Sequence, residues 1–248
     1  DQGPKVASTA LEIDGQQVQL AGMAKGAGMI GPNMATMLAV VMTDATVGAE
    51  DLQVALGRAI EQSFNCISVE GHTSTNDTVL LLASGASGGS TLSGEALEQF
   101  CQALDSVCVE LAKQIPADGE GSSHLITIDV QGASSREEAR QIAQTIANSN
   151  LVKAGVAGAD PNWGRIISAV GYAGVEIDPD QVRVAINGVD LYQQGSPLRF
   201  DVAQVSASIA DNVDTSIVVE LNSGTAAARF WTSDLTADYV RFNSEFHT

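Results

Sequence analysis

Short blocks of apolar residues, separated by turn residues, open the chain. Residues 11–13 and 18–20 flank Asp14 and Gly15, a pair that favours a tight two-residue turn, so the pattern predicts a β-hairpin. Residues 38–42 are apolar and partly β-branched. This suits a buried strand, although a buried helical turn gives the same pattern.

Helical periodicity predicts two longer elements. Residues 49–64 carry apolar side chains at helical spacing, with acidic residues in the first turn, where they complement the helix dipole. Residues 93–115 form a long amphipathic pattern with a partial capping signal at Ser93 and Glu95. Proline removes a backbone donor and disfavours helix in the preceding residue, so we expect this helix to end before Pro116.

The rest of the chain mixes both kinds of element. A helix is predicted over residues 135–148, opened by Ser135 and two glutamates, and a short helix is predicted from Asn162. Apolar runs predict the remaining strands, which are residues 78–83, 125–130, 182–186, 200–207 and 216–222.

This order of elements indicates the fold class. Strands and helices lack strict βαβ alternation, which favours a layered α+β arrangement of helices and sheets over a doubly wound parallel sheet. The sequence PADGEG at 116–121 is the clearest internal boundary. We therefore divide the chain into residues 1–35, 36–118 and 119–248, and expect the last part to be a second domain of α/β type.

The composition excludes several classes of protein. The 248 residues are 44% hydrophobic and 17% charged, so the chain can bury a substantial core. A formal net charge of -18 argues against nucleic acid or an anionic membrane as a partner. No apolar run approaches a membrane span and no signal peptide is recognised, so we expect a cytoplasmic protein.

The cysteines do not indicate a framework of disulfides. Cys66, Cys101 and Cys108 are odd in number and lack CxxC spacing, so we expect buried reduced thiols rather than a disulfide or zinc site. We expect no metal and no cofactor.

The stretch from Lys25 to Ala45, KGAGMIGPNMATMLAVVMTDA, is the best candidate for chemistry. Three glycines and a proline favour a loop, the apolar run after them favours a fixed element, and Thr36 lies where the two meet. A reactive hydroxyl held beside adaptable backbone suits nucleophilic catalysis. By pattern alone, a threonine that is merely a strand residue is the alternative.

The segment GMIGPNMATML, residues 28–38, resembles the autocleavage segment of the ornithine acetyltransferase (glutamate N-acetyltransferase) family. The resemblance extends from Asp1 to Thr248, and several motifs in register are more specific than one. The family's other motifs occur in the expected order: AKG at 24–26, STNDT at 74–78, GEG at 119–121, ADPNWGR at 159–165 and the ending DYVRFNSEFHT.

This resemblance implies the sandwich fold of self-processing aminopeptidases and ornithine acetyltransferases, and cleavage of the bond between Ala35 and Thr36. Thr36 then becomes the catalytic nucleophile. Its freed amine, with a pKa of roughly 7.7–8.0, is a suitable general base. The implied enzyme is an acyltransferase of arginine biosynthesis that moves the acetyl group of N2-acetylornithine to glutamate through an acetyl-Thr36 intermediate. Some relatives also take acetyl-CoA as donor.

Four further residues match the family's substrate contacts. Lys25 would pair with a substrate carboxylate as a point charge, and Glu120 would hold the cationic amine of ornithine. Asn243 and Thr248 match two C-terminal contacts, which implies an ordered chain end. By pattern alone, a solvated loop lysine and a solvated acidic turn are the alternatives for Lys25 and Glu120.

Two other motifs carry no assigned role. Residues 75–77 are interpreted as a strand cap, with hydrogen bonding near Thr36 as the alternative. Asp160, Asn162 and Arg165 suit an anion or a subunit contact, but turn and cap chemistry explains them as well.

Two single residues complete the prediction. His124 replaces the lysine of the family's GEGATK segment and is expected at the surface. Arg241 is expected to be structural rather than a substrate contact.

The resemblance also implies a missing partner. The Thr-Gly pair that supplies the oxyanion hole belongs to the family's upstream half. Residues 1–35 correspond to the end of the α chain and residues 36–248 to the β chain, so we expect an αβ heterodimer that assembles into a higher homo-oligomer. The alternatives are a related self-processing aminopeptidase or amidase, in which water takes the acyl group, and a non-catalytic assembly subunit.

Overall fold

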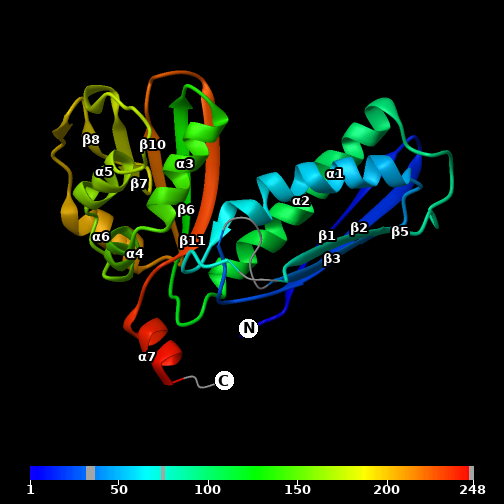
Figure 1. Ribbon diagram of the computed structural model, residues 1–248, viewed down its shortest axis with the longest axis horizontal. Helices are drawn as coiled ribbons and strands as arrows, with labels where there is room; N and C mark the ends of the chain where they lie inside the picture. The colour runs from blue at the N-terminus through cyan, green and yellow to red at the C-terminus, as the bar shows by residue number, and fades with distance from the viewer. Residues whose placement is uncertain (32–36, 74–75, 246–248) are drawn as a thin grey trace. The chain divides into compact units, whose positions relative to one another are not determined.

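A computed structural model describes residues 1–31, 37–73 and 76–245 (Figure 1). The chain separates into two compact units, Asp1–Gly119 and Glu120–Thr248. The two units are described in turn.

A four-stranded sheet forms the base of the first unit. Its order is β1 (Lys5–Ile13), β2 (Gln16–Lys25), β3 (Leu38–Thr43) and β5 (Thr78–Ala83). The first two pairings are antiparallel and the pairing of β3 with β5 is parallel. Asp14 and Gly15 both have positive φ, 50° and 75°, as a type I′ turn requires, which confirms the predicted hairpin.

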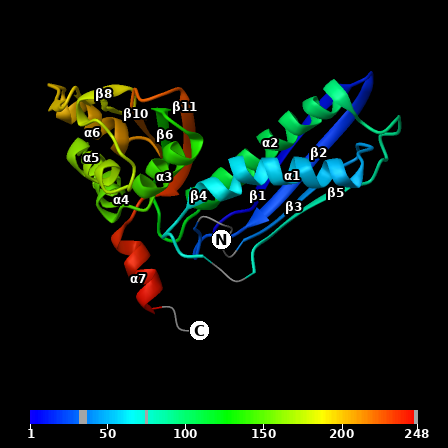
Figure 2. The same cartoon turned by 45° about the horizontal axis from the view of Figure 1, so that its top comes forward.

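Two helices lie on one face of this sheet, α1 (Ala49–Gln62) and α2 (Gly94–Ala117) (Figure 2). The short η1 (Phe64–Cys66) and β4 (Ile67–Ser68) follow α1. The contact between α2 and the sheet is close, because a Cβ on Gly22 would lie 2.7 Å from Cδ1 of Leu111. Phe100, Leu104 and Leu111 of α2 are fully buried, and the helix packs against β1, β2 and α1.

The prediction that α2 ends before Pro116 is wrong. The helix continues through Pro116 to Ala117, and the amide of Asp118 still donates to the carbonyls of Gln114 and Ile115. In a last turn, proline removes a single helical hydrogen bond. Pro116 is also buried, so its packing offsets part of that loss.

The second unit is built on a sheet with β11 (Ala226–Ser233), β6 (Leu125–Ala133), β10 (Asp214–Glu220), β7 (Arg183–Ile186), β8 (Val189–Gln193) and β9 (Ser196–Pro197) in that spatial order. β6 and β10 are parallel, and the other neighbours in this series are antiparallel.

The second unit also contains α3 (Arg136–Ala147), α4 (Asn150–Ala157), α5 (Trp163–Gly171), η2 (Pro179–Gln181), α6 (Val202–Ala210) and α7 (Ala237–Glu245). α3 packs against β6 and β11. The side chains of Ser135 and Asn162 accept hydrogen bonds from the amides of Glu138 and Arg165, so the predicted N-caps of α3 and α5 are confirmed.

The strand predicted over residues 200–207 is wrong, because this segment begins helix α6. Asp201 caps the helix by accepting from the amide of Gln204, and Val205 and Ile209, four residues apart, are its buried side chains. Eight residues cover only about two turns of a helix, so the apolar positions in 200–207 could be mistaken for the alternation of a strand.

Strands and helices are thus mixed in both units, and the fold class is α+β, as predicted. Cys66, Cys101 and Cys108 are free and buried, also as predicted. Burial raises the pKa of the Cys108 thiol to about 12, which keeps it protonated and unreactive. Within the described parts of the chain, no helix is long and apolar enough to cross a membrane.

Candidate functional site

The proposed cleavage bond, Ala35–Thr36, and the proposed contact Thr248 lie outside the described residues. The residues on either side of the cleavage segment are described, and so are Lys25, Glu120 and Asn243. The structure therefore shows what holds the chain before and after the segment.

Ile30 anchors the chain before the cleavage segment. Its amide donates to Oε1 of Glu70 at 2.6 Å, and its carbonyl accepts from the amides of Val69 and Gly71 at 2.9 and 3.2 Å. Ile30 is also almost fully buried. Three hydrogen bonds thus hold one residue of the loop to the connection between β4 and β5.

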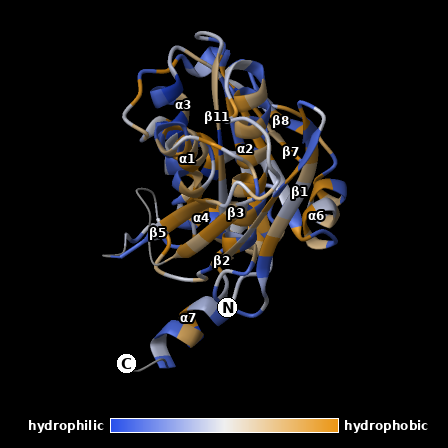
Figure 3. Ribbon diagram, turned by 90° about the vertical axis from the view of Figure 1, so that its right-hand side faces the viewer, coloured by the Kyte–Doolittle hydropathy of each residue, from blue (hydrophilic) through white to orange (hydrophobic). Residues whose placement is uncertain are grey.

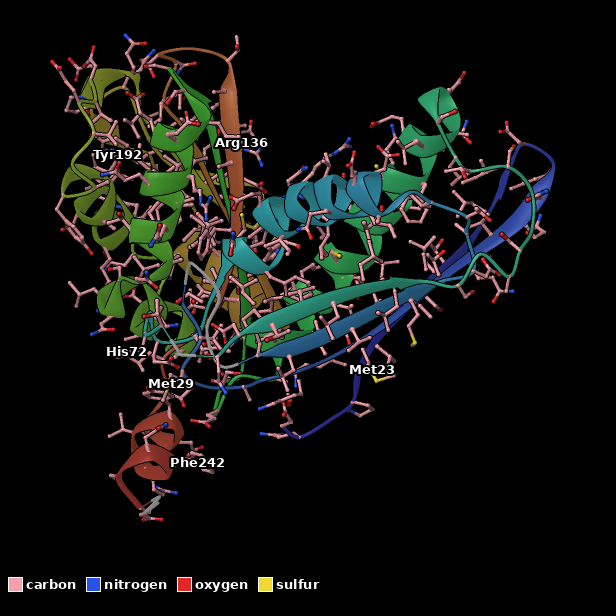
Figure 4. The ribbon with its side chains drawn as sticks, turned by 45° about the vertical axis from the view of Figure 1, so that its right-hand side comes forward. Met23, Met29, His72, Arg136, Tyr192 and Phe242 are labelled. Atoms are coloured by element: carbon pink, nitrogen blue, oxygen red, sulfur yellow. The ribbon has the colours of Figure 1, made fainter. Side chains whose placement is uncertain are left out.

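Gly31 permits a close approach between the same two segments. A Cβ at this position would lie 2.7 Å from the carbonyl carbon of Gly71, a contact that would force the backbone apart. Met29 and His72, both labelled in Figure 4, belong to these facing segments. A glycine at position 31 is therefore needed for this close packing.

Met37 anchors the chain after the cleavage segment. Its amide donates to Oδ1 of Asp77 at 2.7 Å, and its carbonyl accepts from the amide of Thr78 at 3.1 Å. Because Leu38 pairs with Thr78 in the parallel ladder, Asp77 stands directly before β5 just as Met37 stands before β3. Burial raises the pKa of the Asp77 carboxyl, although the bond from Met37 acts in the opposite direction.

The interpretation of residues 75–77 is thereby resolved for Asp77. This side chain binds the amide that joins Met37 to Thr36, so the alternative, hydrogen bonding near Thr36, describes it better than a cap of its own strand. Thr75 lies outside the described residues.

Lys25 is the last residue of β2 and pairs with Leu38, the first residue of β3. It is exposed, on the sheet face opposite the helices. The next amide, of Gly26, donates to Oδ1 of Asp1 at 2.9 Å, and Asp1 also accepts from the buried Nζ of Lys5 at 2.6 Å. The backbone after Lys25 is thus held by a partly buried ion pair.

The uncovered face of the first sheet carries apolar side chains. Side chains alternate between the two faces of a strand, so residues that point away from α1 and α2 recur at every second position. Met23 is seen on this face in Figure 4, and Figure 3 shows hydrophobic residues along β3 and β5. Six large side chains here are 40–59% exposed: Val6, Met23, Leu38, Met42, Leu80 and Leu82.

In the second unit, Glu120 and Asn243 are neighbours. Nδ2 of Asn243 donates to Oε2 of Glu120 at 3.1 Å. Thr236 Oγ1 donates to the carbonyl of Gly121 at 2.5 Å and accepts from the amide of Tyr239, so it both caps α7 and joins the helix to the GEG turn. These bonds, and those of Asp234 with Ser123 and His124, are together named the C-terminal contact.

The expectation that His124 lies at the surface is wrong. The Asp234 side chain is fully buried and accepts from the Ser123 amide, the Ser123 hydroxyl and His124 Nδ1, at 2.9, 2.6 and 2.8 Å. His124 Nε2 faces the carbonyl of Ile209 at 3.2 Å. Both ring nitrogens thus lie within hydrogen-bonding distance of an oxygen atom, and Asp234 holds the ring in place through Nδ1.

The ADPNWGR segment is held by local bonds. Besides the Asn162 cap, Arg165 Nη1 donates to the carbonyl of Leu151 at 2.8 Å, and Nη2 lies 3.6 Å from Asp160. Turn and cap chemistry therefore explains this motif. Arg241 is largely exposed and lies 3.4 Å from Asp238, within α7.

Comparison with known proteins decides the family. A family model described as the ArgJ family matches residues 1–248. The chain belongs to the ArgJ family.

Curated ArgJ relatives are similar over almost the whole chain. The arginine biosynthesis bifunctional protein ArgJ of Rhodopirellula baltica is 45% identical over 251 residues, covering 100% of this chain and 61% of the relative. The glutamate N-acetyltransferase of Methanopyrus kandleri is 45% identical over 238 residues, covering 95% of this chain and 61% of the relative. The chain therefore spans about three fifths of the length of these relatives.

A solved ArgJ structure has the same fold. The crystal structure of the arginine biosynthesis bifunctional protein ArgJ from Bacillus halodurans matches with a TM-score of 0.80 at 40% identity. The match covers 82% of this chain and 96% of the solved chain.

The ArgJ motifs and the geometry agree in part. Two of the residues proposed to contact substrate, Glu120 and Asn243, lie together in the second unit. Sequence reasoning missed Glu70 and Asp234, although both lie near recognised motifs. Over the described ranges 1–31, 37–73 and 76–245, no group of three or more His, Cys, Asp or Glu side chains is placed to hold a metal ion.

Proposed function

We propose that this chain is part of an ArgJ-type glutamate N-acetyltransferase of arginine biosynthesis. It would transfer the acetyl group of N2-acetylornithine to glutamate. The observation that carries this proposal is the hydrogen bond between Asn243 and Glu120, residues 123 positions apart that the resemblance assigns to one substrate. The names of the relatives, arginine biosynthesis bifunctional protein and glutamate N-acetyltransferase, support the same reaction.

The first chemical step is self-cleavage. The Thr36 hydroxyl attacks the carbonyl carbon of Ala35, the C–N bond breaks, and the chain is held by an ester to Thr36 Oγ. Water then hydrolyses this ester and leaves a carboxylate on Ala35 and a free amine on Thr36.

The mature Thr36 then carries the acetyl group. Its hydroxyl attacks the acetyl carbonyl of N2-acetylornithine, its own amine accepts the hydroxyl proton, and that proton passes to the departing α-amine of ornithine. The α-amine of glutamate attacks the acetyl ester in the second half, and the hydroxyl is restored. An amine with a pKa of roughly 7.7–8.0 can relay these protons near neutral pH.

The substrate contacts follow from charge and hydrogen-bonding capacity. Glu120 would bind the side-chain ammonium of ornithine, and Asn243, which already donates to Glu120, holds that carboxylate in place. Lys25 would pair with a substrate carboxylate, and Thr248 would add a contact from the chain end. If this chain is part of a bifunctional enzyme, the same site would also take acetyl-CoA as the acetyl donor.

We further propose that the upstream half of the precursor covers the apolar face of the first sheet, giving an αβ heterodimer in the cytoplasm that pairs into a higher oligomer. The six exposed side chains on that face support this partner, because apolar surface of this kind is normally buried. The upstream half would also supply the donors that stabilise the tetrahedral oxyanion.

The full-length precursor tests this proposal. With N2-acetylornithine and glutamate together, we expect ornithine and N-acetylglutamate in equal amounts. With N2-acetylornithine alone, we expect no more ornithine than one equivalent of enzyme can release. Continuous release of acetate without glutamate would instead identify a hydrolase, and no reaction at all would favour a non-catalytic subunit.

A further inference from the structure

Two carboxylates flank the cleavage segment. Glu70 binds the amide of Ile30 at 2.6 Å, and Asp77 binds the amide of Met37 at 2.7 Å. Both come from the connection between β4 and β5. The two amides lie before and after the stretch that contains Ala35 and Thr36. We name Glu70 and Asp77 the flanking carboxylates.

These hydrogen bonds are of the strong kind. A carboxylate that accepts from an N–H forms shorter and stronger hydrogen bonds than a neutral acceptor does. At 2.6 and 2.7 Å, both bonds are short for N–H···O hydrogen bonds. Both bonds are partly buried, so water competes less for the donors. The carbonyls of Ile30 and Met37 are also bonded, to the amides of Val69, Gly71 and Thr78.

The position of Asp77 follows from strand register. β3 and β5 are parallel, and Leu38 is opposite Thr78, so the residue before one strand meets the residue before the other. The position of Glu70 depends on the close packing of Gly31 against Gly71. The sheet and the glycine contact therefore set both ends of the segment independently of its own conformation.

We propose that Glu70 and Asp77 are positioning residues for self-cleavage at Ala35–Thr36. This inference rests on the proposed function. Intramolecular attack by a hydroxyl is fast only when the reacting groups are already held near each other, and holding both ends of a short segment removes most of its other conformations. In this role the flanking carboxylates act through the backbone amides of Ile30 and Met37.

The chain offers a matched control. Asp44 follows β3 at its other end, and its Oδ1 accepts from the amide of Gln19 at 2.8 Å. Asp44→Ala therefore removes the same kind of bond from the same sheet, away from the cleavage segment. A general effect of losing one carboxylate–amide bond from this sheet would slow cleavage in Asp44→Ala as well as in Asp77→Ala.

The test follows cleavage of the full-length precursor by intact mass during cell-free synthesis. We expect Asp77→Ala and Glu70→Ala to slow cleavage by on the order of 10- to 100-fold, and Asp44→Ala to stay within about twofold of wild type. Asp77→Asn and Glu70→Gln keep an oxygen acceptor, so we expect them to restore most of the rate. Thermal unfolding of each variant, with Thr36→Ala added to keep all chains uncleaved, should show similar midpoints for Asp77→Ala and Asp44→Ala.

The outcomes are distinguishable. If wild type cleaves and Asp77→Ala cleaves as fast as Asp44→Ala, the positioning role is refuted while the proposed function stands. If Asp77→Ala does not fold, Asp77→Asn decides: a folded Asp77→Asn chain that stays uncleaved refutes positioning through the hydrogen bond, and a cleaved one supports it. A wild-type precursor that never cleaves refutes the proposed function itself.

Discussion

Asn243, in the C-terminal helix α7, donates a hydrogen bond of 3.1 Å to the carboxylate of Glu120, at the start of the second unit. The pairing of β6 with β11 explains why residues so far apart meet. Leu125 is opposite Ser233, so the residues before β6 and after β11 continue side by side. Glu120 and Asn243 are the pair in the C-terminal contact that lies farthest along the chain from these two strand ends.

We expect Asn243→Ala and Glu120→Ala to weaken substrate binding more than they slow the chemical step. Both variants should raise KM for N2-acetylornithine by about tenfold or more, since a hydrogen bond to a charged group contributes roughly 1.5–3 kcal/mol. Steady-state kinetics of the mature enzyme measures this. Asn212→Ala is a suitable control, because the Asn212 side chain donates to the carbonyl of Ser208, within its own segment. Unchanged KM in both site variants would remove these residues from the substrate site.

Gly121 is needed for the C-terminal contact to form. Its φ is +66°, and a Cβ would lie 2.5 Å from the amide nitrogen of Tyr239. Gly121→Ala should therefore lower the free energy of unfolding by at least about 2 kcal/mol. Gly57→Ala, in the interior of α1 with open space around it, should instead raise it by roughly 0.5–1 kcal/mol. Urea unfolding of both variants checks this, and equal effects would contradict the close approach.

Removing His124 should leave the buried Asp234 carboxylate short of a hydrogen-bond partner. We expect His124→Ala to lower the free energy of unfolding by on the order of 2 kcal/mol, because a buried polar group that loses its partner costs roughly 1–3 kcal/mol. His124→Lys places a hydrogen-bond donor at this position again, as in the family segment that this chain resembles, and should recover most of the loss. Unfolding of the two variants separates these cases. If lysine proves as damaging as alanine, a hydrogen bond to Asp234 is not what His124 supplies.

Lys5 should make the first unit sensitive to acid. Burial raises the pKa of Asp118, but bonds from Lys5 and from the amides of Gln2 and Gly3 outweigh it, so the pKa lies below the ordinary 3.8. A lowered pKa favours the folded state above 3.8, and this stabilisation is lost as the pH falls through the folded value.

The variant Lys5→Met tests this linkage. It should be less stable than wild type by on the order of 3 kcal/mol near neutral pH, since it leaves two carboxylates beside a buried apolar side chain. The difference should shrink as the pH is lowered below about 3.8, because Asp118 then takes up a proton in both proteins. Urea unfolding at several pH values measures it, and a difference that grows in acid would reverse the assigned sign.

Local signals in the sequence were sufficient for several elements. The Asp14-Gly15 turn, the Ser135 cap and the Asn162 cap depend on residues within a few positions of each other, and all three form as predicted. Residues 200–207 failed because eight residues sample too little of a helical period.

The candidate site shows the same limit. Asp77 lies in a recognised motif, but its bond to Met37 depends on the parallel register of β3 and β5. His124 looked like a surface residue because its partner, Asp234, is 110 positions away and reaches it only through the pairing of β6 with β11. Contacts of this kind become visible only once the sheet is assembled.

The central claim is that Thr36 becomes a new chain start and carries the acetyl group. Intact-mass and peptide analysis of the full-length precursor, after incubation with N2-acetylornithine labelled in its acetyl group, tests it most directly. We expect two chains cut between Ala35 and Thr36, the label on the peptide that begins TMLAVV, and neither result in Thr36→Ala. A precursor that stays in one piece, or a peptide that begins TMLAVV and never carries the label, would contradict the claim.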